Sequence, residues 1–301
     1  MIQTAPFLKP GDCIGITCPA GYMSYEKAAS CITTLQQWGY KVKPGKTLGS
    51  DSDNYFSASD DERLAEFQRL LLDDDVKAIL CARGGYGTSR IIDRINFKKF
   101  KKKPKWIIGF SDITLLHTHI YSNCKVASLH APMAAAFNDE AAGPYLLSLK
   151  RALEGGKTRY SVPPHPMNRK GESVGELVGG NLALLAHACG TVSDFKTRGR
   201  ILFLEDVGEY LYSIDRMLIQ LKRNGKFDQL AGMIVGGFTD CKDTERPFGE
   251  SAYDIIYSHI KEYDFPVCFG FPVSHGTENY ALKVGVGHKL KVGGKRTLLE
   301  E

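Results

Sequence analysis

Short apolar runs alternate with longer amphipathic segments through the first half of this sequence, and that alternation limits the folds it can adopt. The apolar runs lie at 12–20, 40–45, 76–82, 106–110 and 125–132. Segments 24–38 and 58–74 carry apolar residues at the spacing of amphipathic helices. Strands that alternate with helices form a largely parallel sheet covered on both faces. The sequence therefore predicts an α/β domain at 1–158.

Two serines predict where these helices begin. Ser24 stands at the start of the first segment, and Ser59 precedes a run of acidic residues that favours a helical first turn. Gly39 follows the first segment and is a typical helix stop.

The second half of the chain has a different character. Residues 161–173 hold three prolines and no apolar period, which predicts a linker at 159–173. Glycine-rich apolar runs follow at 175–180, 199–206, 232–238, 266–272 and 281–292. Helical segments separate some of these runs, at 181–189, 213–223 and 250–262. We therefore expect a second, more β-rich domain at 174–301.

Composition points to a soluble cytoplasmic protein. Hydrophobic residues make up 43% of the chain and charged residues 24%, as in ordinary globular proteins. The eight cysteines form no Cys-x-x-Cys pair, and several lie inside apolar runs, a pattern typical of free thiols in a reducing compartment. No signal peptide and no apolar run long enough to span a bilayer is evident, so no membrane partner is expected.

The net charge of +5 is concentrated in one basic block, Lys98–Lys105. Such a block can bind phosphate or nucleic acid, or it can be a solvated loop before a buried strand. It holds one aromatic residue and no flanking recognition motif, so we favour the solvated loop and expect no nucleic-acid partner.

A sharp corner is predicted where the apolar run 106–110 meets Ser111 and Asp112 and helix-like sequence begins. A serine between a strand and a helix is usually an N-cap. The alternative is a nucleophile held on a tight strand-to-helix turn, as in the Gly-x-Ser-x-Gly elbow. The motif here is Gly-Phe-Ser-Asp, without the second glycine, so the spacing alone favours the cap.

The loop at 82–90, ARGGYGTSR, follows another apolar strand and matches neither common nucleotide-binding motif. Neighbouring parallel strands end side by side, so the amides of Gly84 and Gly85 could lie beside Ser111. With the Asp112 amide, they would form an oxyanion hole. The simpler alternative is that both loops only start helices.

Two further strand ends carry groups suited to acid–base chemistry. The strand in 202–209 delivers Glu205 and Asp206, and Asp206 could instead cap the next helix. His275 lies in a loop between Ser274 and Gly276, where small neighbours cannot bury it, and the alternative is an exposed loop histidine with no role. A serine, an acid and a histidine at separate strand ends suit a serine hydrolase.

The histidines His117, His119 and His130 offer a competing site, which with Asp112 could be drawn as a metal cluster. Residues two apart on a helix do not share a face, so His117 and His119 would diverge. We therefore expect no metal site.

At this point the chain resembles the LD-carboxypeptidase family of serine peptidases, which includes the microcin self-immunity peptidases. The resemblance covers nearly the whole length. It rests on an ordered set of motifs: CPAG (18–21), ARGGYG (82–87), IIGFSD (107–112), LHAPM (129–133), GELVGGNLALL (175–185), LFLEDVGE (202–209), IDRML (214–218) and GFPVSHG (270–276).

The resemblance implies a flavodoxin-like N-terminal domain joined to a C-terminal swivelling β/α domain, with the active site between them. It makes Ser111 the nucleophile, Glu205 the acid and His275 the base. The oxyanion donors would be the Asp112 amide and one amide from Gly84 or Gly85. Ser274 departs from the glycine expected before the histidine, and TENYALKVG after it matches only loosely, which bears on side-chain selection.

The implied reaction is hydrolysis of an amide between an L-residue and a terminal D-residue, with no metal or organic cofactor. In the family this removes D-alanine from the cytoplasmic murein tetrapeptide during peptidoglycan recycling, and members are commonly homodimers. Two alternatives stay open: a self-immunity peptidase that cleaves a peptidyl-nucleotide antibiotic, and a non-catalytic protein that binds a small anionic ligand.

Overall fold

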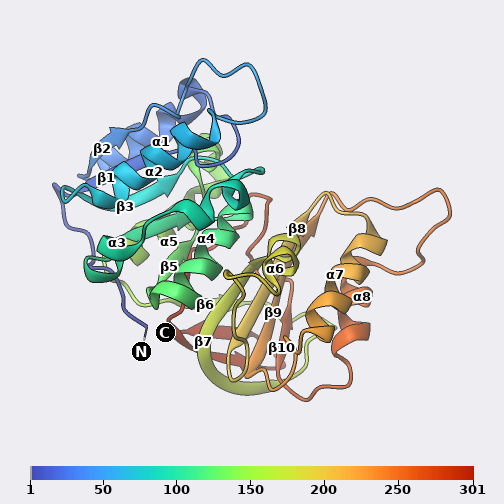
Figure 1. The fold of residues 1–301 in the computed structure, drawn as a ribbon. Coiled ribbons are helices and arrows are strands. Elements are labelled where there is room, and N and C mark those ends of the chain that lie inside the picture. The colour runs from blue at the N-terminus through green and yellow to red at the C-terminus, as the bar shows by residue number, and fades with distance from the viewer. Residues whose placement is uncertain (1) are drawn as a thin grey trace.

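The computed structural model describes residues 2–301, which form two lobes, each built around its own β-sheet (Figure 1). The N-terminal lobe has the strand order β11-β5-β4-β3-β1-β2. Its strands are β1 (Cys13–Thr17), β2 (Lys41–Pro44), β3 (Val76–Cys81), β4 (Trp106–Gly109), β5 (Ser128–His130) and β11 (Leu282–Val284). β1 to β5 pair in parallel and β11 runs antiparallel to β5.

Helices cover both faces of this sheet. α1 (Tyr25–Gln37) and α5 (Gly143–Leu153) pack on one face, and α2 (Asp60–Leu72), α3 (Lys98–Lys102) and α4 (Thr114–His119) pack on the other. Each face buries its own apolar cluster, because alternate strand residues point to opposite sides. The predicted α/β fold is confirmed.

The predicted helix starts are also confirmed. The Ser24 hydroxyl accepts a hydrogen bond from the Lys27 amide at 3.3 Å and caps α1. Ser59 forms a full capping box with Glu62, which satisfies two backbone donors at the start of α2.

The C-terminal lobe has the strand order β10-β9-β8-β7-β12-β13-β6. Its strands are β6 (Arg159–Val162), β7 (Gly171–Asn181), β8 (Ile201–Val207), β9 (Gly232–Thr239), β10 (Val267–Phe269), β12 (Gly287–Val292) and β13 (Thr297–Glu300). β7 to β10 pair in parallel, whereas β12, β13 and β6 add antiparallel strands beyond β7.

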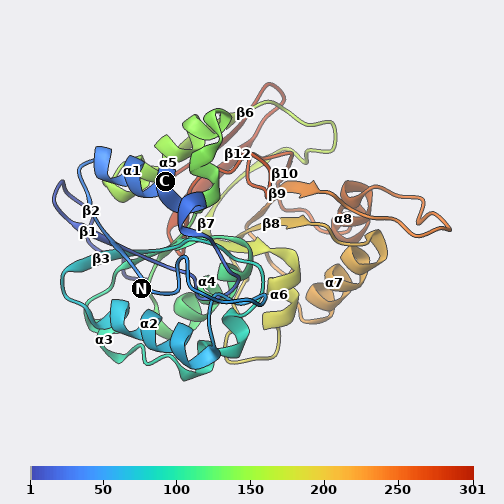
Figure 2. The same ribbon diagram turned by 90° about the horizontal axis from the view of Figure 1, so that it is seen from above.

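Helices α6 (Leu182–Ala188), α7 (Leu211–Arg223) and α8 (Ala252–Ile260) cover one face of the second sheet. Its other face is packed by side chains from its own antiparallel strands and from β11. Figure 2 shows α7 and α8 on the side of the molecule opposite to α1, α2 and α3.

Two elements differ from the predicted division. β6 lies inside the predicted linker 159–173 and pairs with β13 at the edge of the second sheet. The single strand predicted at 281–292 is broken at Gly285, whose φ is +88°, into β11 and β12. β11 joins the first sheet although its residues fall in the predicted C-terminal domain, because an apolar pattern does not reveal which sheet a strand joins.

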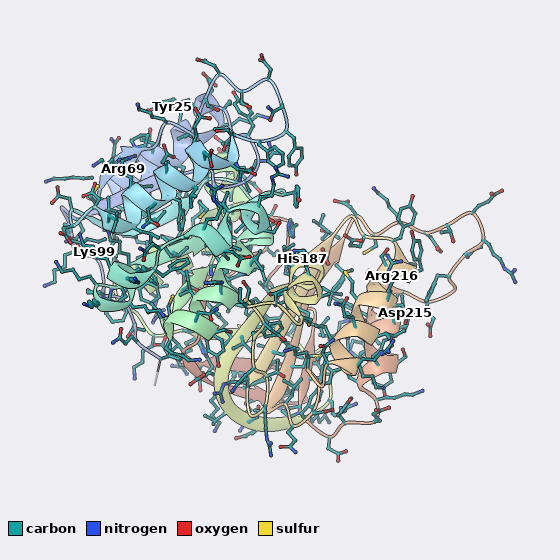
Figure 3. All side chains as sticks on the ribbon, viewed as in Figure 1. Tyr25, Arg69, Lys99, His187, Asp215 and Arg216 are labelled. Carbon is teal, nitrogen blue, oxygen red and sulfur yellow. The ribbon has the colours of Figure 1, made fainter. Side chains whose placement is uncertain are left out.

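The basic block at Lys98–Lys105 is not the predicted loop: its first five residues form α3, anchored by the buried Phe100. Lys99 and Lys103 pair with Asp74 at 3.0 and 3.3 Å. Lys105 is buried and donates to the Leu70 carbonyl at 2.8 Å, and burial lowers its pKa to about 8. Figure 3 shows Lys99 on the outer side of the N-terminal lobe, across the molecule from Asp215 on α7.

All eight cysteines are free thiols, and the buried ones are Cys18, Cys31, Cys81, Cys124 and Cys268. Across residues 2–301, the helices are all too short or too polar to cross a membrane.

Candidate active site

The corner after β4 holds Ser111 in a left-handed backbone conformation, with φ of +63°. β4 ends at Gly109, a single turn covers Ser111–Ile113, and α4 starts at Thr114. Gly109 has φ of +153°, and a Cβ there would lie 3.0 Å from the Ile113 side chain, so the corner requires glycine. A serine in the left-handed conformation lowers the stability of the folded state by about 1 kcal/mol or more. Residues with such backbone strain are found most often at functional sites.

Ser111 does not cap the helix that follows it. The N-cap residue of the turn is Phe110 and that of α4 is Ile113, and neither helix start has a side-chain cap. The capping role favoured by spacing is therefore wrong, and the Ser111 hydroxyl is free for other chemistry.

A buried histidine, His117, contacts the backbone of this corner. His117 on α4 contacts the Gly109 carbonyl through Nε2 at 2.8 Å and the Ser128 hydroxyl through Nδ1 at 2.8 Å. Because a carbonyl only accepts, Nε2 carries the proton and Nδ1 accepts from Ser128. Burial lowers the pKa of His117 to about 4, so it is neutral at physiological pH. His117 is thus a structural part of the corner.

The glycine loop after β3 lies directly against this corner, as the parallel order of β3 and β4 predicts. A Cβ built on Gly84 would stand 2.9 Å from the Ser111 Cβ and 3.2 Å from the Asp112 amide nitrogen. The Thr88 amide donates to the buried Asp112 carboxylate at 2.8 Å, and this hydrogen bond joins the loop to the turn.

Burial raises the pKa of Asp112, and the Thr88 hydrogen bond opposes that rise. Gly84 and Gly85 donate no backbone hydrogen bond to other residues of 2–301.

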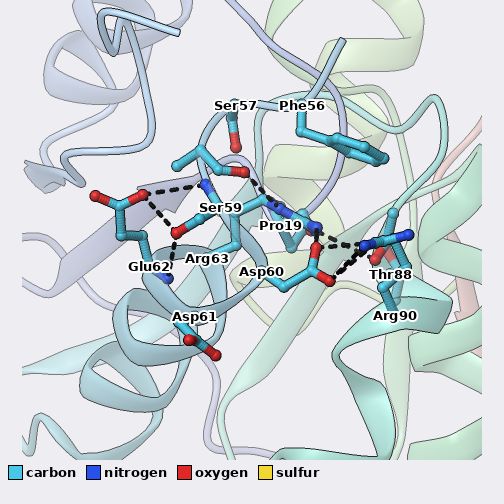
Figure 4. A network of polar contacts seen from close by, with 12 residues as sticks. Pro19, Phe56, Ser57, Ser59, Asp60, Asp61, Glu62, Arg63, Thr88 and Arg90 are labelled. Atoms are coloured by element: carbon cyan, nitrogen blue, oxygen red, sulfur yellow. Dashed lines mark hydrogen bonds and ion pairs between the residues drawn. The ribbon is translucent and has the colours of Figure 1, made fainter. Parts of the chain in front are cut away.

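The loop is held from its other side by Arg63 of α2, whose side chain is fully buried. Its guanidinium donates to the Gly87 carbonyl at 3.1 Å and to the Pro19 carbonyl, and it pairs with Asp60 (Figure 4). Asp60 also binds Arg90 at 2.9 Å. One buried cation therefore joins the 18–21 loop to the glycine loop.

In the C-terminal lobe, Glu205 and His275 form a direct pair. Glu205 Oε2 accepts a hydrogen bond from His275 Nδ1 at 2.6 Å, and the Glu205 side chain is 0% exposed. Burial disfavours a charged imidazole, but the hydrogen bond and the charge of Glu205 outweigh it and raise the pKa of His275 above its ordinary value. The pair has the geometry of a base held by a carboxylate.

Asp206 points elsewhere. Its carboxylate accepts from Asn181 Nδ2 at 2.7 Å, from the Ala183 amide at 3.0 Å and from the Val207 amide at 2.8 Å. Asp206 therefore binds the N-cap residue and the first turn of α6, which precedes it in sequence, and not the next helix, the alternative that the sequence left open. Burial and the nearby charge of Glu205 raise the pKa of Asp206 to about 7.

The two lobes meet at this site. The Phe110 ring, next to Ser111, lies edge-on to the His275 ring with centroids 4.8 Å apart. The Asn181 amide at the end of β7 donates to the Thr114 hydroxyl on α4 at 3.1 Å. The expectation that His275 cannot be buried is wrong: its side chain is only 15% exposed, because Glu205 and Phe110 from other elements cover it. Its Nε2 is buried and has no hydrogen-bond partner in residues 2–301, so no hydrogen bond joins it to Ser111. Phe110, the neighbour of Ser111, thus contacts His275, whose Nε2 is left without a partner.

A cavity of about 610 Å³ opens beside His275, between the lobes. Its charged lining residues are Lys27, Arg83 and Asp139, which the sequence analysis did not single out. Arg83 stands inside the ARGGYG motif, where its charge beside two glycines was the available signal. Lys27 lies on α1 and Asp139 in the loop before α5, and neither belongs to a motif.

Ser274, which departs from the expected glycine, shapes the loop around His275. Its hydroxyl donates to the Glu278 carbonyl at 2.9 Å and accepts from the Gly276 amide at 3.1 Å. Thr277 in the same loop donates to the Asp139 carboxylate at 2.8 Å and so links the loop to the N-terminal lobe.

The histidines of the competing metal hypothesis are not arranged as ligands. His119 contacts the Ser193 hydroxyl through Nδ1 at 2.9 Å, while His130 is buried without a hydrogen bond in the described chain. Burial lowers the pKa of both rings. Within residues 2–301, no three His, Cys, Asp or Glu side chains are grouped as metal ligands would be.

Comparisons with known proteins agree with this architecture. Family models described as the N-terminal and C-terminal domains of LD-carboxypeptidase match residues 14–131 and 174–290. The probable murein peptide carboxypeptidase of Bacillus subtilis is 36% identical, over 97% of this chain and 93% of that protein. The crystal structure of muramoyltetrapeptide carboxypeptidase from Oxalobacter formigenes matches with a TM-score of 0.86 and 27% identity, over 96% of this chain and 98% of that one.

The microcin C7 self-immunity protein of Escherichia coli is also similar, at 25% identity over 100% of this chain and 98% of that protein. The two-domain fold expected from the sequence motifs is therefore the fold of this chain. The chain belongs to the LD-carboxypeptidase family of serine peptidases.

Proposed function

We propose that this protein is a serine carboxypeptidase that hydrolyses an L,D amide bond and releases terminal D-alanine from murein tetrapeptide. The observation that carries the proposal is the buried hydrogen bond between Glu205 and His275, 2.6 Å long, set across the lobe interface from the strained corner of Ser111. The similarity of this chain to murein peptide and muramoyltetrapeptide carboxypeptidases also supports the proposal.

In the proposed reaction, Ser111 Oγ attacks the carbonyl carbon of the scissile amide while His275 Nε2 takes the hydroxyl proton. Glu205 holds Nδ1–H, which leaves Nε2 as the accepting nitrogen and stabilises the imidazolium. The Asp112 amide and an amide of Gly84 or Gly85 bind the oxyanion. His275 then protonates the departing amine, D-alanine leaves, and water hydrolyses the acyl-enzyme through the same base.

The test is release of D-alanine from purified murein tetrapeptide by the wild-type protein and by Ser111→Ala. Loss of a triad nucleophile costs on the order of 10⁶ in kcat. The variant should keep the wild-type melting temperature and lose nearly all turnover. A folded Ser111→Ala protein with more than a few per cent of the wild-type rate would show that Ser111 is not the nucleophile.

A second candidate function is cleavage of a peptidyl-nucleotide antibiotic, which is favoured by full-length similarity to a microcin self-immunity protein. The two functions share the proposed triad and differ in the group next to the scissile bond. Parallel assays on murein tetrapeptide and on an aminoacyl sulfamoyl nucleoside separate them, because the preferred substrate will show the larger kcat/KM.

We further propose that the protein acts in the cytoplasm during peptidoglycan recycling and works as a homodimer. The free thiols support a reducing compartment. Light scattering on the purified protein tests the dimer, and accumulation of tetrapeptide in a deletion strain tests the recycling role.

A further inference from the structure

The cavity beside His275 holds an arginine with no acidic partner. Arg83 is exposed and lines the cavity, and it forms no ion pair within residues 2–301. Its Nη1 donates to the Tyr22 carbonyl at 2.7 Å, and its Nε would lie 3.6 Å from a Cβ built on Gly21. One backbone contact therefore steadies the guanidinium, while its remaining N–H donors stay free to bind a ligand.

Arg83 is also close to the proposed chemistry. It immediately precedes Gly84, where a Cβ would be 3.1 Å from the Ser111 hydroxyl oxygen. The cavity that Arg83 lines also contains His275, the group that would protonate the leaving amine. A leaving residue released toward His275 would therefore enter the cavity that Arg83 lines.

The charge and size of the lining suit a small acid. Lys27 adds a second cation, and it too lacks an ion-pair partner in the described chain. The acid among the lining residues, Asp139, is engaged: one carboxylate oxygen accepts from Thr277 at 2.8 Å and the other from the Ala141 amide at 3.0 Å. Much of the remaining lining is small and apolar: Ala82, Ala135, Ala136 and Ala142.

We propose that Arg83 binds the terminal carboxylate of the leaving residue, assisted by the positive charge of Lys27, and so confines the enzyme to C-terminal residues. An arginine fork matches a carboxylate with two parallel hydrogen bonds, which fixes the orientation of the residue as well as its charge. The small apolar surfaces would face its methyl side chain. This inference rests on the proposed L,D-carboxypeptidase function and names the group that recognises its substrate.

The experiment compares two L,D peptides that differ only at the C-terminus, one ending in D-alanine and the other in D-alanine amide. Both are assayed with wild-type protein and with Arg83→Gln, Arg83→Lys and Lys27→Met. Arg94→Gln is the matched control, because Arg94 is an exposed arginine outside the cavity that pairs with Asp61 at 2.6 Å. Arg94→Gln removes one positive charge from the protein, as Arg83→Gln does.

A charged hydrogen-bonded contact corresponds to about 10- to 100-fold in kcat/KM. The wild type should have a higher kcat/KM on the free acid than on the amide. Arg83→Gln should lower kcat/KM by about this factor on the acid only. Arg83→Lys should recover part of the lost kcat/KM. Lys27→Met should have a smaller effect of the same kind, and Arg94→Gln should match the wild type.

An equal loss on acid and amide would overturn the assignment, because Arg83 would then act on loop structure. Failure of the wild type to cleave either peptide would refute the proposed function, and this inference with it.

Discussion

Glu205 and His275 lie 70 positions apart in the sequence and share a hydrogen bond of 2.6 Å between Oε2 and Nδ1. The neighbour of Glu205, Asp206, is equally buried but binds Asn181 and the start of α6. Two adjacent carboxylates therefore have separate tasks: one is placed to orient a base, and the other joins a strand to a helix.

The first prediction separates these two acids by mutation. Glu205→Gln keeps the shape of the side chain but favours the wrong imidazole tautomer, a change that costs about 10⁴ in kcat in chymotrypsin-type enzymes. Asp206→Asn should keep most of kcat and lower stability by about 1–2 kcal/mol, since an amide cannot accept all three of the hydrogen bonds at this position.

The measurement is kcat and melting temperature for both variants on one D-alanine-terminated peptide. A crippled Asp206→Asn beside a near-normal Glu205→Gln would reverse the assignment of the triad acid.

The second prediction concerns the pH dependence of kcat/KM. His275 acts as a base only when neutral, and Glu205 raises its pKa above the ordinary value of 6.5. Activity should therefore rise with pH along an acidic limb whose midpoint lies above 6.5. Glu205→Gln removes the charge and weakens the hydrogen bond, so the limb of its residual activity should move to lower pH. A limb that stays in place in Glu205→Gln would argue against titration of His275.

The third prediction tests the approach of the glycine loop to the nucleophile. The backbone of Gly84 is outside the left-handed region, so alanine fits its conformation, but the added Cβ would stand 2.9 Å from the Ser111 Cβ. Gly84→Ala should fold normally and lose about 10²- to 10³-fold in kcat, the cost of disturbing an oxyanion hole.

Gly287→Ala provides the control, since a Cβ there meets nothing within 4 Å. If Gly84→Ala turns over at the wild-type rate, the loop does not contribute to the transition state.

The fourth prediction concerns Arg63, the buried cation behind the same loop. Arg63→Met would remove the hydrogen-bond donor of the buried Gly87 and Pro19 carbonyls. The substitution should therefore lower the free energy of unfolding by about 2–4 kcal/mol. Turnover should fall as the glycine loop loosens, and Arg63→Lys should restore part of both quantities. Chemical denaturation and kcat measured on the same samples would show whether stability and turnover change together.

The fifth prediction is that activity survives prolonged EDTA treatment and gains nothing from zinc or manganese. The reason is that His117 is committed to Gly109 and Ser128, and residues 2–301 contain no grouping of three ligand side chains. Chelator-sensitive activity that is restored by a metal would refute the serine mechanism.

Several features of the fold could be predicted from local sequence because local physics determines them. Ser24 and Ser59 cap helices through bonds to residues three positions away, so the signal and its partner lie in one short segment. The alternation of apolar runs with amphipathic helices is similarly local, and it implies a parallel sheet whose strand ends meet along one edge. That edge is where the glycine loop reaches Ser111.

Local spacing in the sequence located the corner at Ser111 and favoured a helix cap, whereas the family resemblance pointed to a nucleophile with an exposed hydroxyl. In the folded chain, Ser111 has a left-handed φ of +63°, His117 contacts the Gly109 carbonyl, and the Gly84 loop packs closely against Ser111. These contacts join different elements, and only the folded chain brings them together.

Local spacing did not choose which carboxylate faces His275; the family resemblance named Glu205, and only the tertiary structure brings its carboxylate to the imidazole. Glu205 and Asp206 are both buried, so neither exposure nor alternation could choose between them, and the pairing of β8 with β9 shifts register between Leu204 and Asp206. Only the tertiary structure shows that β11 pairs in the first sheet and not in the C-terminal one. Only the tertiary structure shows that Arg83, Lys27 and His275 line one cavity. Such relationships depend on how two sheets pack against each other, a long-range result that no local spacing in the sequence encodes.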